Sequence, residues 1–144
     1  MHGLGLDAAN GINLTEGWYW DQNDEKRAFG EKFMARTQRM PNTIQVGTYS
    51  AVTQYLKAIE AAKTDETKAV AAKLHEMPVD DVFTHSGKVQ ANGRMAYDMY
   101  LFQVKAAADS TKPWDYYKEI STVPAADAYL SVEDSGCDVA SFPK

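Results

Sequence analysis

The segment GINLTEGWYWDQNDE, residues 11–25, places a predicted strand before a predicted helix. Residues 12–15 are largely apolar and lie between two glycines, which is typical of a short strand. Apolar and polar residues alternate only weakly there, so we expect helices to cover both faces of the strand. Asn23 then caps a helix whose first turn carries Asp24 and Glu25, which complement the positive end of the helix dipole. This order of elements predicts an α/β fold.

Three helices are predicted from apolar spacing and from helix-stopping residues. The first extends from Asn23 and is stopped by Pro41, which cannot continue a helix. The second has a predicted inner face at helical spacing, formed by Tyr49, Val52, Leu56 and Ile59. The third is predicted to have Thr64 as its N-cap and an inner face formed by Val70, Leu74 and Met77.

The remaining sequence predicts strands and a tail. Asn92-Gly93 is typical of a hairpin turn, because both residues tolerate a positive φ. The aromatic and apolar run Met95–Val104 predicts one long strand, and Tyr117–Thr122 predicts another. Residues 124–144 are polar and irregular, which favours a tail. The pattern thus predicts three helices with four or five strands, and by itself it does not select a topology.

Composition narrows the classes of function. The chain has 144 residues, enough for one ordinary domain core, and a formal net charge of −5. It has no cluster of Lys and Arg, which argues against a nucleic-acid partner. No apolar run approaches the ~20 residues that a membrane-spanning helix needs, so no membrane insertion is expected. Cys137 is the single cysteine, either a free thiol or half of a disulfide to another chain or segment.

Five stretches together resemble one known family in their order and spacing. They are residues 5–15, residues 18–33, Pro41–Val52, Gly87–Val104 and Trp114–Lys118. Through them the region from Gly5 to Lys118 resembles the C-terminal part of type I periplasmic solute-binding proteins, in the branched-chain amino acid receptor group of ABC importers. No single stretch is specific, and their common order carries the resemblance.

The resemblance implies a partial Rossmann-like fold shared between two lobes. Residues 1–17 would end one lobe, residues 18–22 would form the hinge or crossover, residues 23–123 would belong to the second lobe and residues 124–144 would form a C-terminal tail. The family's chain begins well upstream of Met1. We therefore expect this chain to be a C-terminal fragment, paired with the missing N-terminal half or with a second copy.

The implied function is that of the solute-binding component of an ABC importer. Such receptors close by a hinge around a small, amino-acid-like ligand, and an ABC permease recognises the closed form. The start of the chain lacks a signal peptide. The resemblance implies a periplasmic location, with the signal peptide on the absent N-terminal part. The alternatives are a stand-alone α/β module that self-associates and a ligand-sensing regulator.

The expected ligand-binding residues follow from side-chain chemistry and from the position of the crossover. They are Trp18, Tyr19, Trp20, Asp21 and Tyr49. Aromatic rings provide rigid apolar area with a polar tip, which suits a solute pocket. The competing interpretation places any one of these rings in the core. For Tyr49 we expect Thr48–Ser50 to start a helix, where free backbone N–H groups favour a carboxylate, although a core position is at least as plausible.

Two carboxylates, Glu16 and Asp21, are close in sequence to the aromatic cluster. Either could receive an ammonium group, although carboxylates near loops are usually solvated. No catalytic residues are expected, because the sequence has no nucleophile elbow, phosphate-binding loop or Cys/His constellation. No metal or other cofactor is expected either, since the three histidines lack ligand spacing.

Overall fold

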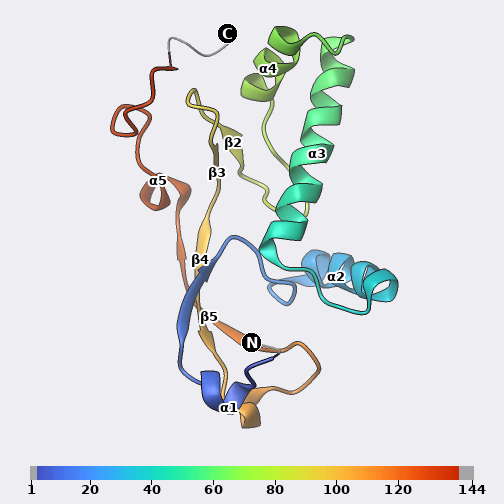
Figure 1. The fold of residues 1–144 in the computed structure, drawn as a ribbon, viewed down its shortest axis with the longest axis vertical. Coiled ribbons are helices and arrows are strands. Elements are labelled where there is room, and N and C mark those ends of the chain that lie inside the picture. The colour runs from blue at the N-terminus through green and yellow to red at the C-terminus, as the bar shows by residue number, and fades with distance from the viewer. Residues whose placement is uncertain (1–2, 140–144) are drawn as a thin grey trace. The chain divides into compact units, whose positions relative to one another are not determined.

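The computed structural model describes residues 3–139 and divides into two compact units (Figure 1). The first unit contains the residues up to Thr43 together with Met99–Val123. The second contains Ile44–Asp98 and the chain from Pro124 onward. Within the described residues, none of the helices combines the length and apolar character that crossing a membrane requires.

The first unit is built on an antiparallel sheet. Its strands are β1 (Asn13–Glu16), β4 (Met99–Val104) and β5 (Tyr117–Val123), in the order β1-β4-β5. Two short helices, α1 (Leu6–Ala9) and the 3-10 helix η1 (Ala107–Asp109), precede β1 and follow β4. Alternate residues of β1 are exposed, so the expectation that helices cover both faces of this strand is wrong for the described chain.

Helix α2 (Asp24–Thr37) confirms the predicted cap. The Asn23 side chain accepts a hydrogen bond of 2.9 Å from the backbone N–H of Lys26. The helix ends where Gln38 adopts a left-handed conformation and donates its N–H to the carbonyl of Met34. A β-carbon added at Gly30 would lie 3.3 Å from both Trp20 and Met40, so a side chain would crowd this contact.

The second unit contains the longest helix, α3 (Thr43–Ala62), followed by α4 (Thr67–Glu76). It also contains the hairpin β2 (Lys88–Val89) with β3 (Met95–Ala96), and the short helix α5 (Ala125–Ala128). The hairpin itself is confirmed, but Asn92 and Gly93 are not its two central residues. Only Gly93 of the pair has a positive φ, 78°, and its N–H donates to the Gln90 carbonyl, which makes Ala91 and Asn92 the centre of the turn.

The buried face of α3 is not the predicted one. Its buried residues are Val46, Ser50, Gln54 and Ala58. Two of them are polar and find partners: Ser50 donates to Asp81, and Gln54 donates to the carbonyl of Pro78. Of the predicted inner face, Tyr49, Val52 and Leu56 are exposed and Ile59 is partly exposed. The helix has two faces with apolar residues, and spacing alone selected the uncovered one.

Three further predictions need correction. The helix that contains Tyr49 begins at Thr43, so Thr48–Ser50 do not start it. Glu66, and not Thr64, caps α4 by accepting a hydrogen bond from the N–H of Ala69. The predicted strand Met95–Val104 is two strands, β3 and β4, in separate sheets. The break is at Tyr97, whose ring packs against Phe83, and at Asp98, which accepts a hydrogen bond from the N–H of Ala125.

Candidate functional site

The aromatic cluster Trp18–Trp20 lies in the core of the first unit. All three side chains are buried, and Trp18 is only 1% exposed. The Trp18 ring meets the Phe29 ring of α2 edge-on, with 6.2 Å between ring centroids. Tyr19 packs against two rings of the sheet, Phe102 of β4 at 5.5 Å and Tyr117 of β5 at 4.9 Å. The segment after β1 therefore joins α2 to one face of the sheet.

The polar groups of Tyr19 and Trp20 both bind the loop before β5. The Tyr19 hydroxyl and the Trp20 indole N–H donate to the carbonyl of Trp114, at 2.9 and 3.0 Å. The Tyr19 oxygen in turn accepts from the backbone N–H of Tyr116 at 2.9 Å and of Tyr117 at 3.4 Å. Burial raises the pKa of Tyr19 to about 12, so the phenol is protonated near neutral pH.

The shared acceptor, Trp114, has an unusual backbone conformation. Its φ of 68° is in the left-handed region, which a bulky residue rarely adopts. The next residue, Asp115, is buried and forms an ion pair with Lys105. Asp115 also accepts a hydrogen bond from the N–H of Thr111. These contacts fix the loop that presents the Trp114 carbonyl.

Asp21 has two cationic partners. Its carboxylate lies 3.1 Å from Arg27 of α2 and 3.0 Å from Lys112. Lys112 also lies over the Trp20 ring, 4.7 Å from its centroid. The Asp21 carboxylate thus connects α2 to the loop that contains Trp114 through its ion pairs with Arg27 and Lys112.

A second polar group lies beside the cluster and centres on Lys26. Lys26 is only 6% exposed. Its ammonium donates a hydrogen bond of 2.8 Å to the Gln22 amide oxygen. The same oxygen accepts the backbone N–H of Tyr19, and the Gln22 amide nitrogen donates to Glu119 at 2.9 Å. The ammonium lies 5.0 Å from the centroid of the Tyr100 ring. Burial lowers the pKa of Lys26 to about 8.

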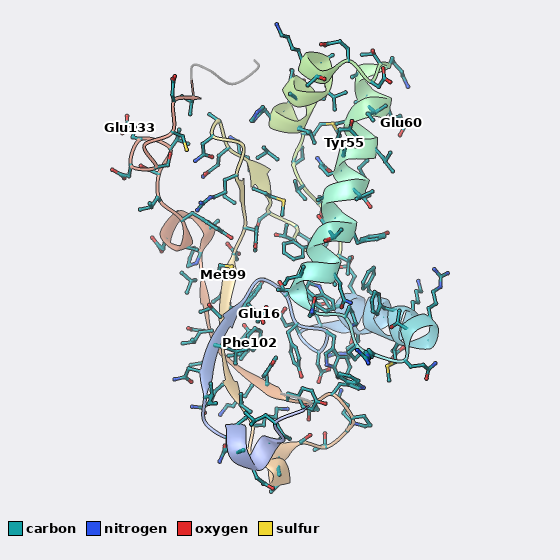
Figure 2. All side chains as sticks on the ribbon, in the orientation of Figure 1. Glu16, Tyr55, Glu60, Met99, Phe102 and Glu133 are labelled. Carbon is teal, nitrogen blue, oxygen red and sulfur yellow. The ribbon has the colours of Figure 1, made fainter. Side chains whose placement is uncertain are left out.

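Glu16, the last residue of β1, is opposite Tyr100 of β4 in the sheet register. Its carboxyl is half-buried, and burial raises its pKa above the usual value. Within residues 3–139 its carboxylate has no hydrogen bond or ion pair. Glu16 and Phe102 are labelled on neighbouring strands in Figure 2.

The structure therefore brings Trp18, Tyr19, Trp20 and Asp21 together in one unit. Tyr49 belongs to the other unit and lies in the second turn of α3, where it is 51% exposed. A free helix N-terminus is thus not available to it. Whether these five residues contact a ligand stays a prediction.

Sequence analysis did not select the residues that hold the cluster in place. The Gln22–Lys26 contact had no helical-spacing signal, because Gln22 precedes Asn23, the N-cap of α2. Trp114 belonged to a stretch noted only for its resemblance, and nothing in the sequence indicated that its carbonyl is the shared acceptor. In the described part of the chain, no group of three His, Cys, Asp or Glu residues is arranged to hold a metal ion.

Comparison with known proteins shows which family this chain resembles. A model of the family described as periplasmic binding protein matches residues 1–110. A search of curated proteins gave no match. Among solved structures, the chain is similar to a periplasmic binding protein from Burkholderia mallei, with 37% identity and a TM-score of 0.93. That match covers 96% of this chain and 36% of the other.

Two further solved structures extend the comparison. A branched-chain amino acid ABC transporter periplasmic ligand-binding protein from Burkholderia xenovorans LB400 is 34% identical, with a TM-score of 0.92 over 96% of this chain and 37% of the other. A leucine-, isoleucine-, valine-, threonine- and alanine-binding protein from Brucella ovis is 15% identical, with a TM-score of 0.72 over 87% of this chain and 34% of that one. This last likeness concerns the fold alone. The chain spans little more than a third of the length of these proteins.

Proposed function

The chain belongs to the periplasmic binding protein family, and we propose that it forms the C-terminal portion of a solute receptor of an ABC importer. The partial type I periplasmic binding protein fold, with its mixture of helices and strands, agrees with this family. The observation that carries the proposal is the match to the Burkholderia mallei protein over 96% of this chain and 36% of the other. The match thus extends over nearly all of this chain and over little more than a third of that protein.

The ligand we propose is a small amino-acid-like solute. Support comes from the Burkholderia xenovorans relative, a ligand-binding protein of a branched-chain amino acid transporter at 34% identity. The solute would be bound reversibly, with no bond made or broken. We further propose a periplasmic location, with the signal peptide on the N-terminal part of the receptor, and an ABC permease as the partner of the ligand-bound form.

Hinge closure is the mechanism that we propose. The chain passes between its two compact units three times, after Thr43, Asp98 and Val123. Several short connections of this kind are where a two-lobed protein can bend without unfolding either part. The Brucella ovis protein of the same fold was solved in a closed conformation. Which residues belong to which lobe of the complete receptor is part of the proposal.

The proposed ligand contacts are Trp18, Tyr19, Trp20, Asp21 and Tyr49. The Tyr19 hydroxyl and the Trp20 N–H already bind Trp114, and the three rings are at most 8% exposed. They would therefore meet a solute only at their exposed edges, through apolar contact and not through hydrogen bonds. The ion pairs of Asp21 and, separately, the Lys26–Gln22 hydrogen bond would hold the rings rigid before the solute arrives. Such preorganisation lowers the entropic cost of binding.

The test is a thermal-shift screen of the complete receptor, meaning this chain with the preceding part of its receptor, against a panel of small solutes. A ligand present at 100 times its dissociation constant stabilises the folded state by about 2.7 kcal/mol, which raises the melting temperature measurably. We expect such a shift with an amino-acid-like solute, and a smaller radius of gyration in solution scattering when it is bound. A panel without any shift would contradict the proposed function.

A further inference from the structure

We propose that Asn92 is a site of spontaneous deamidation, a covalent modification that converts its side-chain amide into a carboxylate. Asn92 lies in the turn of the hairpin β2–β3 (Figure 1). It is not among the residues proposed for ligand contact. The modification is a property of the chain itself and does not depend on the proposed function.

The reaction needs only two neighbouring residues and water. The backbone nitrogen of Gly93 gives its proton to hydroxide and attacks the side-chain carbonyl carbon of Asn92. A C–N bond forms to the backbone, the bond to the side-chain nitrogen breaks, and that nitrogen leaves as ammonia with a proton from water. Water then hydrolyses one of the two C–N bonds of the cyclic imide, which gives aspartate or isoaspartate. No oxidant or reductant takes part.

The first argument is the access to the attacking nitrogen. Asn-Gly occurs twice in the sequence, at Asn10 and at Asn92, and asparagine is among the residues that are chemically labile. Gly93 has φ 78°, and a β-carbon added there would have no atom within 4 Å. Because glycine has no side chain, nothing on this residue shields its nitrogen from the amide carbon of Asn92.

The second argument is the activation of the Asn92 amide. Its side-chain oxygen accepts a hydrogen bond of 3.1 Å from the backbone N–H of Arg94. When the Gly93 nitrogen attacks, negative charge develops on that oxygen. A backbone N–H that already contacts the oxygen stabilises this charge, as donors do in an oxyanion hole.

The hydrogen bond that engages the Gly93 nitrogen is local to the turn. The Gly93 N–H donates to the carbonyl of Gln90 at 2.8 Å. The strands on either side, β2 and β3, have two residues each, so little pairing holds the turn closed. Short, exposed elements open at a low free energy. Opening of the turn therefore frees the nitrogen without unfolding the second unit.

The other Asn-Gly pair, Asn10-Gly11, is held by the sheet of the first unit. The Gly11 N–H donates to the carbonyl of Val104 at 3.0 Å, and the Val104 N–H donates to the carbonyl of Ile12 at 2.9 Å. These bonds extend the pairing of β1 with β4. Freeing the Gly11 nitrogen requires opening this end of the sheet. Asn10 should therefore react more slowly than Asn92, although Asn10 is exposed.

Both products would change the hairpin. Each adds one negative charge to a chain whose formal net charge is −5. Aspartate would keep a side-chain oxygen for the Arg94 N–H. Isoaspartate would add a carbon to the main chain of the turn, and the Gln90 N–H could then no longer meet the Arg94 carbonyl as it does now, at 2.8 Å.

The experiment is incubation of the full chain at mildly alkaline pH in water enriched in heavy oxygen, followed by mass spectrometry of its peptides. Synthetic peptides of residues 88–97 and 6–15 give the rate of each Asn-Gly pair without folded structure. In the folded chain we expect Asn92 to react within about tenfold of its peptide and at least about tenfold faster than Asn10. The rate should rise with pH, because the attacking nitrogen must lose its proton.

Asn92→Gln is the matched control, because glutamine keeps the amide but would have to close a larger ring. This variant should take up no heavy oxygen at position 92, and its ion-exchange profile should lack the acidic form that the wild-type chain acquires. Either rate ratio outside the expected limits would overturn the inference, as would equal formation of the acidic form in Asn92→Gln. The two sites are compared within the wild-type chain, so the result does not depend on how the variant folds.

Discussion

The Tyr19 hydroxyl donates a 2.9 Å hydrogen bond to the carbonyl of Trp114, a residue 95 positions later in the chain. The same oxygen accepts from the backbone of Tyr116 and Tyr117. This one side chain therefore satisfies backbone groups at the start of β5 while its ring packs on the sheet. It makes the first unit a single structure built from two distant segments.

Replacing Tyr19 with Phe tests that role. The ring packing would remain, and the Trp114 carbonyl would keep the Trp20 indole N–H. The backbone N–H groups of Tyr116 and Tyr117 would lose the Tyr19 oxygen as an acceptor. We expect the free energy of unfolding to fall by about 1–3 kcal/mol, the cost of leaving buried polar groups unsatisfied. Urea denaturation of the chain, followed by circular dichroism, measures this change.

Tyr55→Phe is the matched control, because Tyr55 is 47% exposed on α3 (Figure 2). Its loss of a hydroxyl should change stability by no more than about 0.5 kcal/mol. Equal effects at Tyr19 and Tyr55 would show that the bond to Trp114 contributes nothing specific.

Two glycines of the second unit should respond to alanine in opposite directions. A β-carbon at Gly87 would lie 2.7 Å from Thr84 and 2.8 Å from Val79, so Gly87→Ala should destabilise the chain by about 1–3 kcal/mol. At Gly47, inside α3, the nearest atom belongs to Phe83 at 3.6 Å, an ordinary contact. Gly47→Ala should stabilise the chain by about 0.5–1 kcal/mol, because alanine favours the helix. Thermal unfolding distinguishes the signs, and destabilisation at both positions would contradict the packing around Gly47.

The free energy of unfolding should change with pH through the titration of Lys26. Burial lowers its pKa to about 8 in the folded state, from 10.5. Between those values the unfolded chain binds more protons than the folded one, so this group's contribution to stability rises with pH. We expect wild type to gain stability relative to Lys26→Met as the pH increases from 8 to 9.5.

The measurement is urea denaturation of both proteins at several pH values in that window. Tyr19 acts in the other direction only at higher pH. Its pKa is raised to about 12 in the folded state, so its contribution falls as the pH rises above 10. Lys57→Met, on the exposed surface of α3, should leave the profile unchanged. A difference between wild type and Lys26→Met that is constant with pH would argue against the burial of the ammonium.

The exposed face of α3 should be covered in the complete receptor. Ile44, Val52 and Leu56 are exposed in this chain, and Leu56 is 59% exposed. Bare apolar faces of this kind mark surfaces that another segment or chain covers. We expect Leu56→Glu to be nearly neutral in the chain alone and to cost at least about 2 kcal/mol in the complete receptor, where a buried charge would be unpaired.

Denaturant unfolding of both forms measures this contrast. The control is Ala58→Glu, which should destabilise both forms, because Ala58 is fully buried in the chain itself. If Leu56→Glu had no effect in the complete receptor, this face of α3 would be open to solvent there. The preceding part of the receptor would then have to contact this chain at another surface.

Local sequence signals predicted the elements better than they predicted their packing. The Asn23 cap and the hairpin at Asn92-Gly93 depend on neighbouring residues, so they could be recognised without tertiary structure. The buried face of α3 could not, because Ser50 and Gln54 are polar and become buried only through partners at Asp81 and Pro78. The break between β3 and β4 likewise depends on distant contacts.

The candidate site shows the same limit. The sequence indicated that Trp18–Asp21 act together, and the structure gathers them around Trp114 and α2. It did not indicate that Tyr19 and Trp20 both donate to the backbone carbonyl of Trp114, since that residue is more than 90 positions away. Nor did it indicate that Asp21 would pair with both Arg27 and Lys112, because folding brings Lys112 to it from 91 positions away.

Native mass spectrometry of the complete receptor, mixed with the solute that the thermal screen identifies, tests the receptor function most directly. We predict one additional mass per receptor, equal to the intact solute, and recovery of that solute unchanged when the protein is unfolded. Absence of an added mass at saturating solute, or release of a chemically altered compound, would contradict the account.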